Sequence, residues 1–292
     1  FGLACDNVAS YEIVTAEGAI LRVSKSEHEG LFWGLRGGGG NFGVVTEFEF
    51  RLHQIGTTAV LIDNTFDLAE APSAMRRWRD LLDDHVPAQA TPIAWVGTIA
   101  DSSDGQSQPR NRTVASLGFV WVGDPDEGRQ LVPLVDGLGV SLTKRVEDVS
   151  YLGLQSVDDE VHRPGSYRRY FKGHYLSELS DDAIEAFLSQ GEPDPGADRS
   201  RLPNGSFQGY GGAIAATSNE DSAFSHRNAL VEFVAATRWT DAAEDGERMA
   251  AARRYGAVLE PYASGVYVNV LGDEGERGVR RAYPADKLAK LA

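Results

Sequence analysis

The sequence predicts an α+β fold with a large antiparallel sheet covered by helices. A chain of 292 residues is long enough for two domains. Hydrophobic residues make up 42% and charged residues 24%, proportions typical of a chain that buries a core. Strand-like and helix-like segments also follow one another without the strand–helix alternation that a parallel sheet requires.

The first 54 residues predict a small sheet joined to one helix. Segments 11–15 and 19–23 are β-branched or apolar runs around a turn, which indicates a hairpin. Ser26 is the expected cap of a short helix. The glycine run 37–43 ends that helix, and residues 47–52 alternate between apolar and charged side chains, as in a strand with one buried face.

Longer elements follow from about residue 55. Strands are expected at 58–66, 92–100, 113–122, 141–149, 166–176, 206–212, 229–238 and 266–270. Helices are expected at 69–84 and 125–137, after a Ser180 cap, and from Asp241 to about residue 259. Polar loops are expected at 101–112 and 191–205.

The charge and the cysteine content exclude several classes of protein. The net charge of −15 argues against binding to nucleic acid or to an anionic membrane through a general positive field. Cys5 is the only cysteine, so the chain has no internal disulfide and no cysteine-rich metal site. No apolar run reaches membrane-spanning length, and we expect no signal peptide in the first residues. Arginine greatly outnumbers lysine, which indicates a GC-rich genome. We expect a soluble bacterial protein, either cytoplasmic or secreted.

The glycine run does not match a nucleotide-binding loop. Such loops follow a strand and open a helix, so that backbone N–H groups point at a phosphate. Here the run 37–43 follows the predicted helix and enters a strand. A tight helix-to-strand corner and a close approach of backbone to a ligand are both open readings.

Four separated segments carry a recognisable pattern. Residues 31–46 read LFWGLRGGGGNFGVVT, and GLACDN at 2–7 with YEIVTAEG at 11–18 precede them. Further along stand GGAI at 211–214, AFSHR at 223–227 and YVN at 267–269. In this order the segments resemble the FAD-linked oxidases of the berberine-bridge-enzyme-like group, which belong to the vanillyl-alcohol-oxidase and p-cresol-methylhydroxylase (PCMH) type of flavoprotein.

The resemblance implies three regions. Residues 1–54 would be the C-terminal part of a PCMH-type FAD-binding domain, 55–260 a substrate-binding domain, and 261–292 an incomplete segment that returns to the flavin domain. In the family, the pyrophosphate loop and the residues that can tether the flavin precede the stretch that matches 2–7. We therefore expect a C-terminal fragment, in which Cys5 is a small buried side chain and not the tether.

The resemblance also implies FAD as the cofactor and a redox reaction. The expected activity is oxidation of an alcohol or amine of a small metabolite or sugar, by hydride transfer to flavin N5 with molecular oxygen as acceptor. Flavin contacts are expected from Gly2, Leu3, Asp6, Asn7, the main chain of Val14, and more weakly Asn41 and Phe42.

Family resemblance points to Tyr267 as the base that takes the substrate proton and to Asn269 as a flavin or substrate partner. On a strand these two residues would share a face. An unperturbed phenol has a pKa near ~10, so a working base needs a cationic neighbour or a proton relay. Arg227 and Lys172 are the candidate cations and candidate substrate contacts.

Gln208 stands where some relatives carry a carboxylate, and an amide cannot accept a proton in that role. We therefore expect Gln208 to orient substrate, with Tyr210 nearby. On the strand 166–176, a set of polar residues shares one face, which is either solvated or a pocket wall. That set is Arg168, Tyr170, Lys172 and His174.

Other readings stay open. The scattered histidines make a catalytic metal site unexpected, His226 is either structural or a proton shuttle, and no Gly-x-Ser-x-Gly elbow of a serine hydrolase occurs. The chain could be catalytically inactive by itself, or could be a small-molecule or sugar-binding module without redox chemistry.

Overall fold

The computed structural model describes residues 1–84, 86–101, 110–194 and 196–292. The predicted polar loop at 101–112 lies largely outside the described residues, as does residue 195 of the predicted loop 191–205. The chain forms two compact units. Unit 1 comprises residues 1–54, 210–229 and 264–292, and unit 2 comprises 55–209 and 230–263. Residues 210–229, which the sequence analysis assigns to the substrate domain, thus belong to unit 1.

Unit 1 contains a three-stranded antiparallel sheet in the order β2-β1-β3. The strands are β1 (Val8–Val14), β2 (Ile20–Ser24) and β3 (Val44–Phe50), close to the predicted positions. In the register Tyr11 lies opposite both Val23 and Phe48 on one face, while Ser10 lies opposite Glu49 on the other. The sheet therefore has one apolar and one polar face.

Helix α1 (Glu29–Leu35) covers the apolar face. Its Phe32 packs with Tyr11 and Ile13 in a small core. The predicted Ser26 cap is wrong: the residue before the helix is His28, in the left-handed region at φ 54°, and no side chain caps the first turn.

The C-terminal part of unit 1 is helical. It contains η6 (Val268–Val270), α10 (Gly275–Ala282) and α11 (Ala285–Leu291). The predicted strand at 266–270 is wrong, because the backbone turns into a 3₁₀ helix directly after Tyr267. The segment 210–229 adds α8 (Gly212–Ala216) and η3 (Asn219–Asp221).

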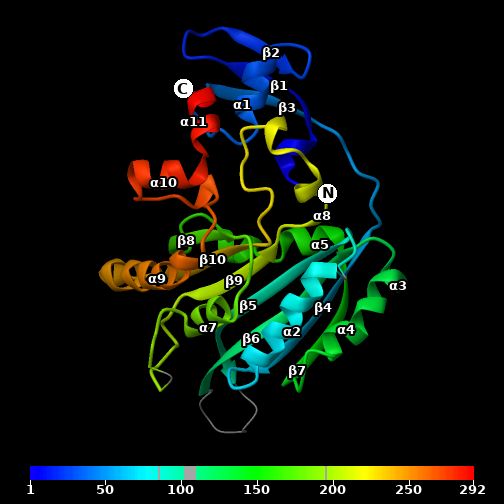
Figure 1. The fold of residues 1–292 in the computed structure, drawn as a ribbon, viewed down its shortest axis with the longest axis vertical. Helices are drawn as coiled ribbons and strands as arrows, with labels where there is room; N and C mark the ends of the chain where they lie inside the picture. The colour runs from blue at the N-terminus through cyan, green and yellow to red at the C-terminus, as the bar shows by residue number, and fades with distance from the viewer. Residues whose placement is uncertain (85, 102–109, 195) are drawn as a thin grey trace. The chain divides into compact units, whose positions relative to one another are not determined.

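Unit 2 is built on a seven-stranded sheet whose neighbours are all antiparallel, which confirms the predicted fold class (Figure 1). Its order is β7-β4-β6-β5-β9-β10-β8. The strands are β4 (Thr58–Asp67), β5 (Ala90–Asp101), β6 (Arg110–Val122), β7 (Thr143–Ser150), β8 (Arg168–Leu176), β9 (Asn204–Gly209) and β10 (Val231–Trp239).

Helices α2 (Ala71–Asp84), α7 (Asp181–Ser189) and α9 (Asp245–Leu259) pack on this sheet and enclose the main core (Figure 1). Ser180 caps α7 as predicted, since its hydroxyl accepts from the Ala183 N–H. The ring of Phe187 stacks on that of Phe207 at 4.1 Å, and Phe233 meets Tyr255 edge-on at 5.0 Å. Each such buried ring contributes roughly 1.5–3 kcal/mol, so the aromatic core holds α7 and α9 on the sheet.

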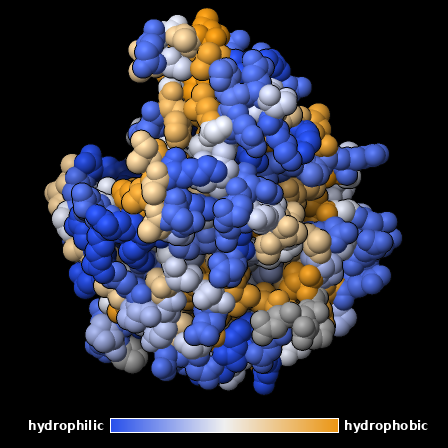
Figure 2. Space-filling model, turned by 45° about the horizontal axis from the view of Figure 1, so that its top comes forward, coloured by the Kyte–Doolittle hydropathy of each residue, from blue (hydrophilic) through white to orange (hydrophobic). Residues whose placement is uncertain are grey.

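Short helical pieces complete unit 2. They are α3 (Pro125–Gly128), η2 (Arg129–Leu131), α4 (Val132–Asp136), α5 (Tyr151–Ser156), α6 (Asp159–His162), η4 (Ala242–Glu244) and η5 (Glu260–Tyr262). The visible surface is mainly hydrophilic and is interrupted by separate apolar patches (Figure 2).

Candidate functional site

The first seven residues form a rigid turn in unit 1. Gly2 takes φ +75°, which favours glycine, and the chain then enters η1 (Ala4–Asn7). The Asn7 amide donates to the carbonyls of Phe1 at 2.9 Å and Leu3 at 3.0 Å, and its oxygen pairs with His53 Nε2 at 2.7 Å. Asn7 thus holds the turn together from inside.

Asp6 and Arg227 form a buried ion pair. The two guanidinium N–H groups donate to the two carboxylate oxygens at 2.6 and 2.8 Å, and the side chains are only 11% and 2% exposed. Arg227 also donates to Ser222 Oγ at 2.8 Å. The structure thus brings a predicted flavin contact and a predicted substrate contact together, and the geometry favours a role for Arg227 in fastening the first turn.

The glycine run is a tight helix-to-strand corner. Gly37 takes φ +111°, and a Cβ there would lie 2.5 Å from the Phe224 nitrogen. Gly43 takes φ +142°, where a Cβ would lie 2.3 Å from the Val14 carbonyl oxygen. Tyr283 Oη donates to the Gly37 carbonyl at 2.8 Å and ties the C-terminal helices to this corner.

The predicted flavin contacts near the corner have different surroundings. Val14 ends β1 with a neighbouring strand on each side. Phe42 faces Gly34, where a Cβ would lie 2.8 Å from the ring, so Phe42 belongs to the packing of α1. Asn41 is exposed.

Tyr267 and Asn269 meet, although not through a strand. Asn269 Nδ2 donates to Tyr267 Oη at 2.7 Å across the first residues of η6. The Tyr267 ring packs edge-on against Phe224, with 6.1 Å between centroids. The structure thus brings the two predicted residues into direct contact.

His226 is held firmly in place. It has φ 63°, its Nε2–H donates to the Arg281 carbonyl at 2.8 Å, and its ring fills the space left by Gly265, where a Cβ would lie 2.3 Å from Cε1. Burial lowers the pKa of His226. This geometry favours the structural reading of His226.

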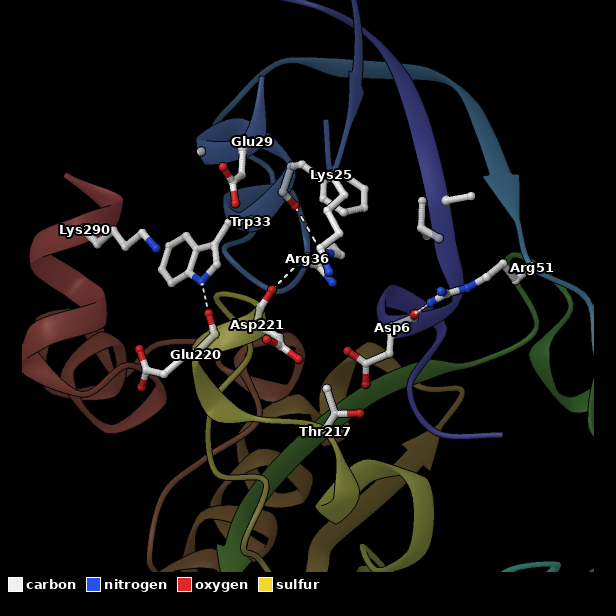
Figure 3. A pocket seen from close by; sticks show the side chains of 14 residues that line it. Asp6, Lys25, Glu29, Trp33, Arg36, Arg51, Thr217, Glu220, Asp221 and Lys290 are labelled. Atoms are coloured by element: carbon white, nitrogen blue, oxygen red, sulfur yellow. Dashed lines mark hydrogen bonds between the residues drawn. The ribbon is translucent and has the colours of Figure 1, made fainter. Parts of the chain in front are cut away.

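A polar cavity of about 780 Å³ lies in unit 1 (Figure 3). Its lining includes four cationic side chains and four carboxylates. They are Lys25, Arg36, Arg51, Lys290, Asp6, Glu29, Glu220 and Asp221. On one wall, Trp33 Nε1 donates to the Glu220 carbonyl at 2.9 Å, and Lys290 Nζ lies 3.9 Å from the centre of a Trp33 ring (Figure 3).

A smaller apolar cavity of about 240 Å³ lies beside the first turn. Cys5, Tyr11 and Phe48 line it together with glycines of the corner, among them Gly40. Burial, with Asp6 nearby, raises the pKa of the Cys5 thiol to about 11, and burial raises the pKa of Tyr11 to about 12. Both groups therefore stay neutral and present an apolar wall at ordinary pH.

In unit 2, Gln208 lies exposed on β9, where the register places it opposite Glu232 of β10 and Ile93 of β5. Glu232 in turn lies opposite Tyr175 of β8. Sequence reasoning missed Glu232: the alternation of β10 gives its face, but the register that sets it beside Gln208 joins distant segments. Tyr210 lies just beyond β9 and is buried.

The face of β8 that carries Lys172 lies under α9 and is not solvated along its length. His174 is 6% exposed and its Nε2–H donates to the Gly256 carbonyl at 2.7 Å. A Cβ on Gly256 would lie 3.1 Å from Lys172 Cβ, and Lys172 Nζ lies 5.3 Å from the centre of the Tyr170 ring. This face is therefore exposed at Arg168, half-buried at Tyr170 and Lys172, and buried at His174.

Among the residues that the structure describes, no group of three or more histidine, cysteine or carboxylate side chains could hold a metal ion. Within the same residues, no helix is long and apolar enough to cross a membrane.

Comparison with known proteins finds relatives along the whole chain. No protein-family model matches the chain. It is 23% identical to the uncharacterized FAD-linked oxidoreductase YvdP of Bacillus subtilis, over 99% of this chain and 62% of that protein. It is 30% identical to the FAD-linked oxidoreductase OXR1 of Pyricularia oryzae, over the whole chain and 58% of that protein. The chain thus spans about three fifths of the length of these curated relatives.

The fold comparison agrees. The structure of BBE-like #28 from Arabidopsis thaliana superposes on the whole chain, and on 64% of its own length, with a TM-score of 0.77 at 22% identity. The motifs from residue 2 to residue 269, the curated relatives and the fold thus point the same way. Over its whole length the chain is similar to curated FAD-linked oxidoreductases, and its fold is that of the berberine-bridge-enzyme-like structures.

Proposed function

We propose that the chain is part of an FAD-dependent oxidoreductase that oxidises an alcohol or amine of a small metabolite or sugar, with oxygen as acceptor. Unit 1 would bind part of FAD, and the sheet of unit 2 would contact substrate. The observation that carries this proposal is the first turn. The polar side chains of Asp6 and Asn7 are engaged inside unit 1, and so is the Leu3 carbonyl, so the turn offers a ligand the backbone N–H groups of Gly2 and Leu3.

The residues of unit 1 fit FAD. The apolar cavity beside Cys5 and Gly40 suits a flat ring system, and the polar cavity offers cations and carboxylates to a phosphate and hydroxyl-bearing chain. When bound, FAD would supply the redox chemistry, by accepting the electron pair that leaves the substrate.

The chain's own groups would bind, orient and take up a proton. Tyr267, assisted by the Asn269 amide, is the proposed base in unit 1. In unit 2 the carboxylate of Glu232 beside Gln208 is a second candidate acceptor, while the Gln208 amide would orient a hydroxyl or amine of the substrate.

Flavin binding is tested by filling the apolar cavity. Gly40 lines the cavity, and a Cβ there meets no atom within 4 Å, so we expect Gly40→Leu to be compatible with the fold and to reduce the space in the cavity. Titration of FAD with the 292-residue chain, followed by quenching of flavin fluorescence, should show at least tenfold weaker binding for this variant. Gly246→Leu, at another open position, is the matched control. Equal affinity of both variants, or no FAD binding by the wild type, would remove the assignment of this cavity.

Catalysis is tested in a chain extended at both ends to the length of its relatives. Tyr267→Phe should slow substrate-dependent flavin reduction by roughly 10²–10⁴, the usual contribution of a general base. Tyr262→Phe is the control. Unchanged kinetics for Tyr267→Phe would transfer the role to Glu232, and peroxide that never forms would favour the binding-module alternative.

A further inference from the structure

A third cavity, of about 340 Å³, lies within unit 2, at the end of the sheet where β8 and β9 begin and β5 and β10 end. It is lined by residues of these four strands, of α6 and of α9. None of its lining residues has a role in the proposed reaction. Its volume falls within the range of small-molecule sites.

The lining of this cavity is cationic. Three arginines and one histidine line it, and its lining residues include no aspartate or glutamate. They are Arg169, Arg238, Arg248 and His162. The chain as a whole carries a net charge of −15, so this cluster of guanidinium groups creates a locally positive potential on a molecule that is negative overall. The cavity therefore favours an anionic group over a neutral or cationic one.

Two of the arginines are fixed in place by the protein. Arg248 donates to Glu244 Oε2 at 2.7 Å and to the Arg201 carbonyl at 2.8 Å, and Arg169 donates to the Val161 carbonyl. Glu244 offsets part of the charge of Arg248. These contacts hold the guanidinium groups at the wall before any ligand arrives, which lowers the entropy lost on binding.

The guanidinium N–H groups of Arg238 are available as hydrogen-bond donors to a ligand in this cavity. The guanidinium carbon of Arg238 lies 5.4 Å from the centre of the Tyr167 ring, and among the described residues Arg238 makes no side-chain hydrogen bond or ion pair. A guanidinium held beside a ring keeps its N–H groups available to a carboxylate or phosphate as a two-pronged donor. Phe171 and Leu202 add an apolar wall.

We propose that this cavity binds a small molecule that carries an oxyanion, a carboxylate or a phosphate, on an apolar body. Arg238 is the principal donor, and Arg169 and Arg248 supply the surrounding positive field. The assignment stands on unit 2 alone and requires neither flavin nor turnover, so it can fail or hold independently of the proposed redox function.

The test uses fluorine NMR with the 292-residue chain and three probes. They are 4-fluorobenzoate, its neutral counterpart 4-fluorobenzyl alcohol, and inorganic phosphate as a competitor. We expect saturable broadening of the benzoate signal and at least tenfold weaker binding of the alcohol. Displacement of benzoate by phosphate would show that a bare oxyanion suffices. Failure of phosphate to compete would show that the cavity recognises a carboxylate on an apolar body.

Arg238→Gln should weaken benzoate binding at least tenfold. Arg163→Gln removes the same charge just after α6 without lining the cavity, and should leave the affinity unchanged. Thermal unfolding of both variants should match the wild type, because both side chains are largely exposed. Equal binding of benzoate and alcohol, equal weakening by both variants, or no binding of benzoate would overturn the proposal.

Discussion

At the scale of single residues, unit 1 depends on polar groups that lie deep in the fold. The Asp6 and Arg227 pair joins residues 221 positions apart in the chain, and Lys287, 4% exposed, donates to the carbonyls of Ser222 and Phe224. Such groups stabilise the fold only while every partner is present, because an unpaired buried charge is costly.

Asp6→Asn should therefore lower the free energy of unfolding by about 3–5 kcal/mol, since it leaves the Arg227 guanidinium buried without its counter-charge. Urea unfolding measures this change. Combining it with Arg227→Met should cost less than the sum of the two single changes, because the pair acts as one unit. Arg22→Gln, which breaks an exposed pair with Glu49, should stay close to wild type.

His226 should make the stability pH-dependent. Since burial lowers the pKa of His226, the unfolded chain binds more protons than the folded chain between the lowered value and 6.5. The contribution of His226 to the free energy of unfolding should therefore rise with pH through that window and stay constant on either side of it. His226→Asn, an exchange that tolerates φ 63°, should flatten this slope just below pH 6.5. An unchanged slope would mean that other groups cause it.

At the scale of elements, β9 and α9 pack closely against each other around one side chain, Tyr255. Tyr255 is fully buried, and its hydroxyl donates to the Phe187 carbonyl at 2.6 Å, near the end of α7. A Cβ on Gly205 would lie 2.0 Å from that hydroxyl oxygen. One phenol thus joins a strand and two helices.

Gly205→Ala should therefore destabilise the protein by about 1–3 kcal/mol, because the rigid Tyr255 ring must move out of its place in the core. Chemical unfolding measures the loss. The double variant with Tyr255→Phe should be less destabilised than the sum, since the nearest clashing atom is gone. If the losses in free energy of unfolding of the two single variants simply add in the double variant, residues 205 and 255 do not clash as proposed.

How far the sequence predicts these elements depends on their length. The ten-residue run of β4 and the capped helix α7 have enough alternation or capping to be recognised. The four-residue α6 and five-residue α8 complete barely one turn, so no helical periodicity accumulates. The apolar residues at 266–270 imitate a strand, yet no neighbouring strand pairs with them and the backbone forms η6 instead.

The contacts of the candidate site were also only partly predictable from the sequence. Tyr267 and Asn269 are two positions apart, so their contact could be predicted even though the secondary structure was wrong. Glu232 beside Gln208, or Asp6 against Arg227, depends on register and packing between segments far apart in sequence. Local patterns contain no information on such pairings.

At the scale of the whole molecule, unit 1 is assembled from three separated segments while unit 2 uses the chain between them. Within unit 1, α11 packs its Leu288 and Leu291 with Val266 and Tyr283, and Lys290 lies over Trp33. The end of the chain therefore supports residues near its beginning.

Deletion of residues 285–292 should selectively loosen unit 1. Loss of Lys287 and of the two leucines exposes the carbonyls of Ser222 and Phe224 and the face beneath them. Hydrogen–deuterium exchange should speed up by at least tenfold in residues 31–43 and 219–229. The strands of unit 2 serve as the internal reference, and equal acceleration there would indicate general unfolding instead.

The buried ion pair between Asp6 and Arg227 and the hydrogen bond from Lys287 to the Ser222 carbonyl join residues that are synthesised at different times. Neither contact can form until its later residue has been made. At about 5–20 residues per second, a ribosome needs on the order of 10–50 s to go from the third strand of the opening sheet to the last lysine of this network. During that interval Phe48 and Phe50, each roughly half exposed even in the finished fold, lie on a nascent polypeptide whose closing segment does not yet exist. Phe48 and Phe50 are therefore side chains that a chaperone would cover during that interval.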